Sequence, residues 1–312
     1  RSLLGSHPLR YVILFGRTTQ DNRGITAGAP SYPTIPSWMP EGVAASLSDN
    51  SGYCTDDVTA MLDDGSGSAL TTSKLTIAIG RIPVTSLASA RDVVDKLLQY
   101  ATKSKKSAWK HRFMFLADDQ DQGAHLTQTE NLIKQYEATG GDRMLPRKVY
   151  LDSYTFVGDR YPDARAAMFR ALEEGVVWWN FVGHANTSGW THEHQLSYAD
   201  INQLYLRHWP FIYAATCEFL RIDGSSVSGG ELMFLQRNGG AVGMLSAVRP
   251  VYISNNGLLS SAMGRAMAMK DDKGRPLPPG EICRRAKNDI RNINNDRVIA
   301  DDNRLRLSLI HI

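Results

Sequence analysis

The sequence is poor in cysteine and close to neutral in overall charge. Three cysteines occur among 312 residues, so they cannot all pair with one another, and no CxxC motif indicates a redox pair or a zinc ribbon. A net charge of +3 is too small to indicate a nucleic-acid partner. No apolar run approaches the roughly 18 residues that a membrane-spanning helix needs. Within this sequence, these absences exclude a zinc ribbon, a nucleic-acid-binding arm and a transmembrane segment.

Hydrophobic residues make up 42% of the chain, enough for a large core, and they gather in short runs typical of buried strands. Segments with apolar residues at helical spacing separate these runs. Strands that alternate with helices predict a parallel sheet with helices on both faces. The predicted strands cover residues 11–16, 75–80, 113–117, 148–151, 178–183, 211–216 and 241–246, and the predicted helices cover residues 86–100, 127–138, 163–174, 198–206 and 231–237.

The chain divides most naturally near residue 105. Residues 1–105 form a predicted N-terminal subdomain that carries a long loop, and residues 106–312 form a predicted catalytic subdomain that carries every candidate reactive group. Because the chain starts at Arg1 rather than Met, we expect a piece of a longer protein whose targeting segment is missing. Residues 307–312 look apolar and unanchored, and we expect residues 290–312 to be a truncated or altered end.

Two of the predicted strands stop at a reactive side chain. The run from Trp178 ends at His184, and the run from Phe211 ends at Cys217. Because ligands bind at the carboxyl ends of parallel strands, both side chains should reach the same edge of the sheet. There an imidazole can take the proton of a thiol and create a nucleophile. A free cysteine more often acts as a small buried hydrophobe, so the prediction depends on the two residues occurring together.

The residues beside this pair fit acyl transfer. The backbone N–H groups of Ala185, next to His184, and of Cys217 are candidate donors to a tetrahedral oxyanion. Glu218 would oppose ionisation of the thiol, so we expect it to pair with Arg221 instead.

The metal-binding patterns are weaker. His192-Glu193-His194 lacks a third ligand and the HExxH spacing, which favours a surface loop. Two groups of aspartates could hold calcium through their carboxylates, although neither fits the EF-hand spacing and both residue sets are common in turns. These groups are Asp118, Asp119 and Asp121, and, as the preferred structural calcium site, Asp56, Asp57 and Asp63 with Asp64 nearby.

Taken together, four segments resemble the gingipain family of cysteine peptidases. They are Asn180–His184, Ala215–Phe219, Gly229–Glu231 and Asn238–Val242. Further short segments, which run in order from about residue 9 to 260, make the sequence most similar to the sortases of the type-nine secretion system, the PorU-type C-terminal signal peptidases.

The resemblance implies a fold and a set of roles. The fold is a caspase-like, gingipain-type α/β fold with a mostly parallel sheet flanked by helices and two subdomains. Cys217 is then the nucleophile and His184 the general base and acid, and an acidic residue at a preceding strand end, Asp119 or else Asp118, orients the histidine. Ala185 stands where the family usually has glycine. No cofactor is required for this chemistry.

The resemblance also implies a function. It is the removal of C-terminal secretion signals from client polypeptides through a thioester, with transfer to a surface glycolipid amine as an extension. The expected partners are these clients and the outer-membrane proteins of the secretion system, at the bacterial cell surface. Two alternatives remain: a general secreted gingipain-like endopeptidase, and a non-catalytic caspase-like scaffold of a secretion complex.

Overall fold

The fold is built around one eight-stranded sheet. The computed structural model describes residues 9–25, 30–39, 52–66, 70, 72–103, 107–290 and 305–310. Neighbouring strands are parallel, except that β10 and β11 are antiparallel. In their order across the sheet, the strands are β1 (Tyr11–Phe15), β2 (Ala78–Ile82), β11 (Leu307–Ile310), β10 (Gly243–Ala247), β9 (Phe211–Ala215), β5 (Trp178–Val182), β3 (Arg112–Ala117) and β4 (Leu145–Tyr150).

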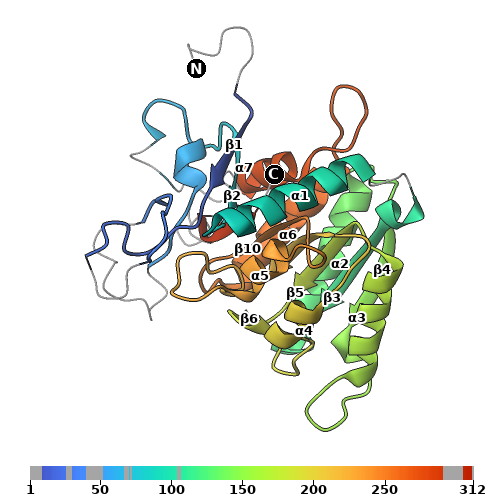
Figure 1. Ribbon diagram of the computed structural model, residues 1–312. Coiled ribbons are helices and arrows are strands. Elements are labelled where there is room, and N and C mark those ends of the chain that lie inside the picture. Colours follow the sequence, from blue (N-terminus) through green and yellow to red (C-terminus); the bar gives the residue numbers. More distant parts are fainter. Residues whose placement is uncertain are drawn as a thin grey trace.

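Helices cover both faces of the sheet, as the alternation of strands and helices predicts (Figure 1). One face carries α1 (Leu87–Lys103), α3 (Pro162–Glu174), α4 (Tyr198–Gln203) and α5 (Gly229–Leu235). The other carries α2 (Ala124–Ala138), α6 (Ile253–Ala268) and α7 (Pro279–Ile290). Short 3-10 turns are η2 (Asp57–Ala60), η4 (Ala108–His111), η5 (Asp121–Gly123) and η6 (Leu151–Ser153).

The central strands are mostly apolar, and both of their faces are buried. On β5, Trp179 and Phe181 pack into the core under α3 and α5, whereas Trp178 and Val182 pack into the core under α2 and α6. Successive side chains of a strand point to opposite faces, so a strand covered on both sides reads as a continuous hydrophobic run. This confirms the predicted strands that end before His184 and Cys217.

The prediction that residues 307–312 are unanchored is wrong. Residues 307–310 form β11, which lies between β2 and β10 and pairs with residues 244–247 of β10. Leu307 and Leu309 are buried in the core beside α6 and α7. A four-residue strand has no local signal of its own, because its partners come from distant parts of the chain. Helices α6 and α7 were likewise not among the predicted elements, and β2 begins at Ala78 rather than at residue 75.

If β11 is an integral strand, Leu309→Ala should lower the free energy of unfolding by about 2–5 kcal/mol, since it removes buried methyl groups and leaves a cavity. Urea denaturation would measure this change. Leu98→Ala, at a position that is 57% exposed, is the matched control and should change stability by less than about 0.5 kcal/mol. Equal and small effects from both substitutions would contradict the central position of β11.

The sheet runs without a break through both predicted subdomains. Strands β1 and β2 belong to the first and are joined by β11 to the strands of the second. The predicted boundary near residue 105 lies outside the described residues, so the division itself stays a prediction. Among the residues that the structure describes, none of the helices combines the length and the apolar character needed to cross a bilayer.

Candidate active site

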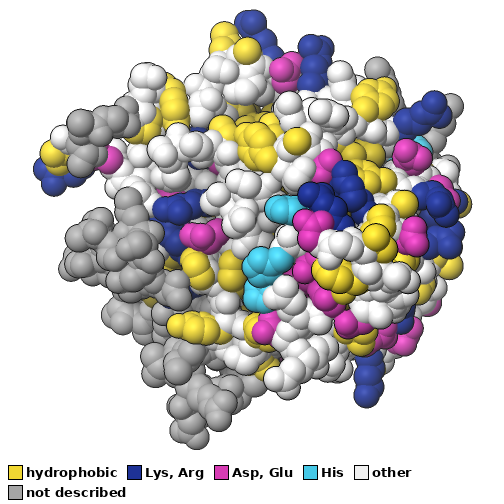
Figure 2. Space-filling model, turned by 90° about the horizontal axis from the view of Figure 1, so that it is seen from below, with side chains coloured by type: hydrophobic (Ala, Val, Ile, Leu, Met, Phe, Trp, Pro, Cys, Tyr) yellow, Lys and Arg dark blue, Asp and Glu magenta, His cyan; other side chains and the backbone are white. Residues whose placement is uncertain are grey.

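His184 and Cys217 follow two neighbouring strands of the sheet. Strands β5 and β9 are parallel and in register, with Val182 opposite Ala215. His184 comes two residues after β5, and Cys217 comes two residues after β9, so both lie at the same carboxyl edge. The structure confirms the predicted placement on adjacent strands. Figure 2, seen from below, shows histidine side chains next to acidic ones near the middle of this face.

Asp118 fixes the backbone of His184. It follows β3, the other neighbour of β5, and is buried with 1% of its surface exposed. Its carboxylate accepts a hydrogen bond of 2.9 Å from the backbone N–H of His184. Between the two strands, a Cβ on Gly183 would lie only 2.5 Å from the Cβ of Asp118, so the close approach requires glycine there. Burial raises the pKa of Asp118 to about 7, although the His184 N–H opposes the shift.

Asp119 contacts a tyrosine rather than the histidine. Its Oδ2 accepts a hydrogen bond of 2.7 Å from the hydroxyl of Tyr161, just before α3. Asp119 and Asp118 were the predicted partners of the His184 ring. In the structure their hydrogen bonds go to the Tyr161 hydroxyl and to the His184 backbone instead.

The carboxylate at the His184 ring is Asp121. Its Oδ2 lies 2.7 Å from Nε2 of His184 and 3.0 Å from Nε2 of the buried His125, on the first turn of α2. Partial burial works against ionisation of Asp121, but the hydrogen bond and charge of His184 lower its pKa below the ordinary value. Burial, with His184 nearby, lowers the pKa of His125 as well. An ionised carboxylate therefore faces the ring of His184, beside a histidine that favours its neutral form.

The thiol of Cys217 is half-buried and not activated at rest. The backbone N–H of Val251 lies 3.4 Å from its sulfur. Burial raises the pKa of the Cys217 thiol, and Glu218 adds to the shift, while the Val251 N–H and Arg306 oppose it. Arg221 pairs with Glu218 at 3.4 Å, which confirms the predicted ion pair. The thiol is thus protonated at neutral pH and needs a base to become a nucleophile.

We therefore expect alkylation of Cys217 by iodoacetamide to follow a pKa above that of an ordinary cysteine, because only the thiolate reacts and burial disfavours it. The measurement is the alkylation rate between pH 6 and 10, with modification of Cys217 followed by peptide mass spectrometry. Buried Cys54 and Cys283 serve as internal controls that should react only after unfolding. A rate that is already maximal at pH 6 would show a resting thiolate and contradict this expectation.

The hairpin after His184 leaves the N–H of Ala185 available. Strand β6 (Ala185–Asn186) pairs with β7 (Gly189–Trp190), and β7 pairs with β8 (Leu196–Ser197). The backbone N–H of Thr191 donates to the carbonyl of His184 at 2.8 Å. Because hydrogen-bonded and non-bonded pairs alternate along an antiparallel ladder, the N–H of the next residue, Ala185, points away from β7. The Ala185 N–H is therefore not used in pairing with β7, and its role as an oxyanion donor stays a prediction.

Backbone strain gathers at the same edge. Among the described residues, every non-glycine residue with positive φ lies in the loops that follow β3, β7 and β9. Such conformations cost free energy and persist where the surrounding structure imposes them, typically at functional sites. These residues are Asp121, Gln122, Thr191, His194 and Glu218.

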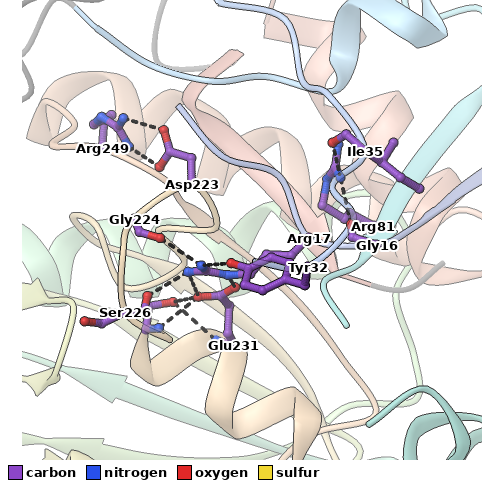
Figure 3. Close-up of polar contacts among 11 residues, drawn as sticks. Gly16, Arg17, Tyr32, Ile35, Arg81, Asp223, Gly224, Ser226, Glu231 and Arg249 are labelled. Atoms are coloured by element: carbon purple, nitrogen blue, oxygen red, sulfur yellow. Dashed lines mark hydrogen bonds and ion pairs between the residues drawn. The ribbon is translucent and has the colours of Figure 1, made fainter. Parts of the chain in front are cut away.

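Buried ion pairs hold the loop that follows Cys217. Arg17, after β1, donates to Glu231 at the start of α5 at 2.6 Å, and to the carbonyls of Gly224 and Ser226 (Figure 3). Arg249, after β10, pairs with Asp223 of the same loop at 2.6 Å. Neither pair was predicted from the sequence, because no local pattern connects Arg17 with Glu231, 214 positions away, or Asp223 with Arg249, 26 positions away. They fix the backbone on the carboxyl side of Cys217.

The preferred calcium residues already have cationic partners. Asp56 forms an ion pair of 2.7 Å with the buried Arg81, and Asp57 forms one of 2.8 Å with the buried Lys287. Asp63 is exposed. Calcium would have to displace these buried cations, so the arrangement does not support the predicted site at Asp56, Asp57 and Asp63. The histidines at 192 and 194 are exposed in a turn, as a surface loop predicts.

This combination of a helix-covered, mostly parallel sheet with a histidine and a cysteine at neighbouring strand ends defines a caspase-like cysteine peptidase fold. Residues 2–308 match the family model described as Peptidase family C25, so the chain belongs to this family, the gingipain family of cysteine peptidases. No curated protein matches the sequence.

Solved structures with this fold include gingipains. The structure of the Arg-specific cysteine proteinase gingipain R (RgpB) aligns with a TM-score of 0.72 and 13% identity, over 98% of this chain and 64% of that one. The complex of Porphyromonas gingivalis RgpB pro- and mature domains aligns with a TM-score of 0.69 and 12% identity, over 98% and 65%. A third, titled only as a protease, aligns with a TM-score of 0.71 and 13% identity, over 100% and 65%. The chain therefore spans just under two thirds of these relatives.

Proposed function

We propose that this protein is a cysteine endopeptidase that works through a Cys217–His184 pair and a thioester intermediate. The observation that carries the proposal is the position of both residues at the carboxyl ends of paired strands β5 and β9. Membership of a cysteine peptidase family supports it. The roles of the individual residues follow from their contacts.

Asp121 sets the tautomer of His184. An ionised carboxylate can only accept a hydrogen bond, so its contact at Nε2 favours the proton on that nitrogen. Nδ1 is then the nitrogen left to act as a base. It takes the proton of the Cys217 thiol as the sulfur attacks the substrate carbonyl. The same proton then passes to the leaving amine, which departs as the thioester forms, and water or another amine releases the acyl group.

Preorganised donors stabilise the oxyanion of each tetrahedral intermediate. The N–H of Ala185 points away from its hairpin, and the N–H of Cys217 belongs to the nucleophile itself. Asp118 holds the His184 backbone, which also positions Ala185. Donors that are fixed before the reaction cost no reorganisation when charge develops.

The physiological reaction that we propose is the removal of C-terminal signals from clients of the type-nine secretion system, at the outer membrane. Transfer of the acyl group to the amine of a surface glycolipid would use the same thioester, with a different acceptor in place of water. The support is the ordered set of segments that resemble the PorU-type sortases. The partners would be client polypeptides and outer-membrane proteins of the secretion system.

The test is the mass of a client's C-terminus in cells that carry the wild-type protein or Cys217→Ala. Without the thiol no thioester forms, so clients should be secreted with their signal intact and without surface attachment. Cys283→Ala, a buried cysteine on α7, is the matched control and should leave processing unchanged. Normal client maturation in the Cys217→Ala strain would overturn the secretion role and leave a general endopeptidase or a scaffold.

A further inference from the structure

Three carboxylates lie together behind His184. Asp118 and Asp119 follow β3, and Glu193 comes from the loop between β7 and β8. Each offers an oxygen, and these oxygens lie within 4.8 Å of one another. Asp118 is 1% exposed and Glu193 is 9% exposed, so water does little to screen their charges.

This cluster has no cation among the residues that the structure describes. The ion pairs around it belong to other carboxylates, such as Asp121 with His184 and Asp200 with Arg165. Buried carboxylates are normally paired with a cation or bound to a metal, since isolated buried charges are costly. Their crowding contributes to the raised pKa of Asp118, after burial itself.

Two oxygens of the cluster also lack a hydrogen-bond donor. They are Oε2 of Glu193 and Oδ1 of Asp119, and both are buried. The remaining oxygens with known contacts accept from neutral groups: Asp118 from the N–H groups of His184 and Asp119, and Asp119 from the Tyr161 hydroxyl. Buried polar atoms without partners in a native protein call for an unseen water or ion. Here the charge of the surrounding groups favours a cation.

We propose that Asp118, Asp119 and Glu193 bind a calcium ion. The donors are all oxygens, which suits a hard cation and excludes the nitrogen and sulfur ligands of a zinc site. Calcium tolerates irregular geometry and takes further ligands from carbonyls and water, whereas magnesium demands near-octahedral coordination. Asp118 and Asp119 were among the alternative calcium ligands predicted from the sequence, whereas Glu193 was not.

The ion would brace the histidine from two sides. Asp118 holds the backbone N–H of His184 at 2.9 Å, and the His184 carbonyl accepts from Thr191, two residues before Glu193. A cation shared by Asp118 and Glu193 therefore ties the end of β3 to the far side of the His184 hairpin. The binding itself does not depend on the proposed peptidase function, whereas its effect on catalysis does.

The test uses the Cys217→Ala chain, so that neither turnover nor self-cleavage affects the result. Terbium replaces calcium, and Tyr161, whose hydroxyl contacts Asp119, should sensitise its luminescence. We expect a saturable signal that calcium displaces and that Glu193→Gln weakens at least tenfold in affinity. Glu218→Gln, which removes a carboxylate outside the cluster, in the loop after Cys217, is the matched control and should bind as the parent does.

Thermal unfolding separates a calcium site from a structural role of Glu193. At calcium concentrations about 100-fold above Kd, the unfolding temperature should rise by roughly 5 °C. In EDTA, Glu193→Gln should unfold at the same temperature as the parent or at a higher one, because it removes the repulsion between Glu193 and the two aspartates. With calcium, the parent should unfold at the higher temperature, because only the parent keeps all three ligands.

Three results would overturn the proposal. They are no saturable terbium signal, an equal loss of stability of Glu193→Gln with and without calcium, and an equal shift from magnesium at the same concentration, which would exclude the assignment to calcium. These readouts do not depend on peptidase activity, because they are made on the Cys217→Ala chain. A failure of the proposed peptidase function would therefore leave them unchanged.

Discussion

Cys217→Ala is expected to abolish peptide hydrolysis, with kcat/KM lower by on the order of 10⁵-fold. Without the sulfur no thioester can form, and the remaining oxyanion donors accelerate only a slow attack by water. His184→Ala should have an effect of similar size, because the half-buried thiol of Cys217 is then protonated and has no base beside it. The measurement is the turnover of a fluorogenic peptide library by the purified protein.

The double variant makes this prediction sharper. Residues that act as one unit give non-additive losses, so Cys217→Ala combined with His184→Ala should be no slower than either single variant. Cys283→Ala is the control for loss of a cysteine elsewhere in the fold and should keep nearly full activity. Losses that multiply in the double variant would show that the two residues act independently and would contradict the pair.

The pair was predictable from the sequence because its placement follows from local patterns. Apolar runs that are buried on both faces mark the strands, and parallel strands bring their carboxyl ends to one edge. This rule alone was enough to predict that His184 and Cys217 lie at the same edge of the sheet. The helix predicted over residues 231–237 is present as well, although α5 begins at Gly229, directly after the capping box that Ser228 and Glu231 form.

The other residues of the site depend on contacts that no local pattern encodes. Asp121, which contacts the His184 ring, and Gln122 both adopt positive φ, at 58° and 56°, a backbone conformation that the strand pattern does not indicate. The rule that reactive groups follow strands directly favours Asp118 and Asp119, which are closer to β3. Strand β11 and the Arg17–Glu231 pair are further cases in which the partner lies 60 or more positions away.

Asp121→Asn should therefore lower kcat by about 10²–10⁴-fold with little change in KM. The amide can donate a hydrogen bond to Nε2, which would place the ring proton on Nδ1 and leave no base facing the thiol. The carboxylate also stabilises the imidazolium that forms during attack, and the amide does not. Steady-state kinetics on the best peptide of the library would give both constants.

Asp119→Asn is the matched control when both variants are assayed in EDTA, so that the proposed calcium site is empty. It removes a charge from the same loop, but from a carboxylate that contacts Tyr161. It should lower kcat by less than about tenfold. If Asp119→Asn is instead the more damaging change, Asp119 is the ring partner in the working enzyme, as its position at the end of β3 predicted. The contact between Asp121 and His184 would then have no role in catalysis. If both changes are harmless, His184 needs no orienting acid at its ring, and the hydrogen bond from its backbone N–H to Asp118 is sufficient to position it. The ratio of the two effects thus identifies which carboxylate acts on the histidine.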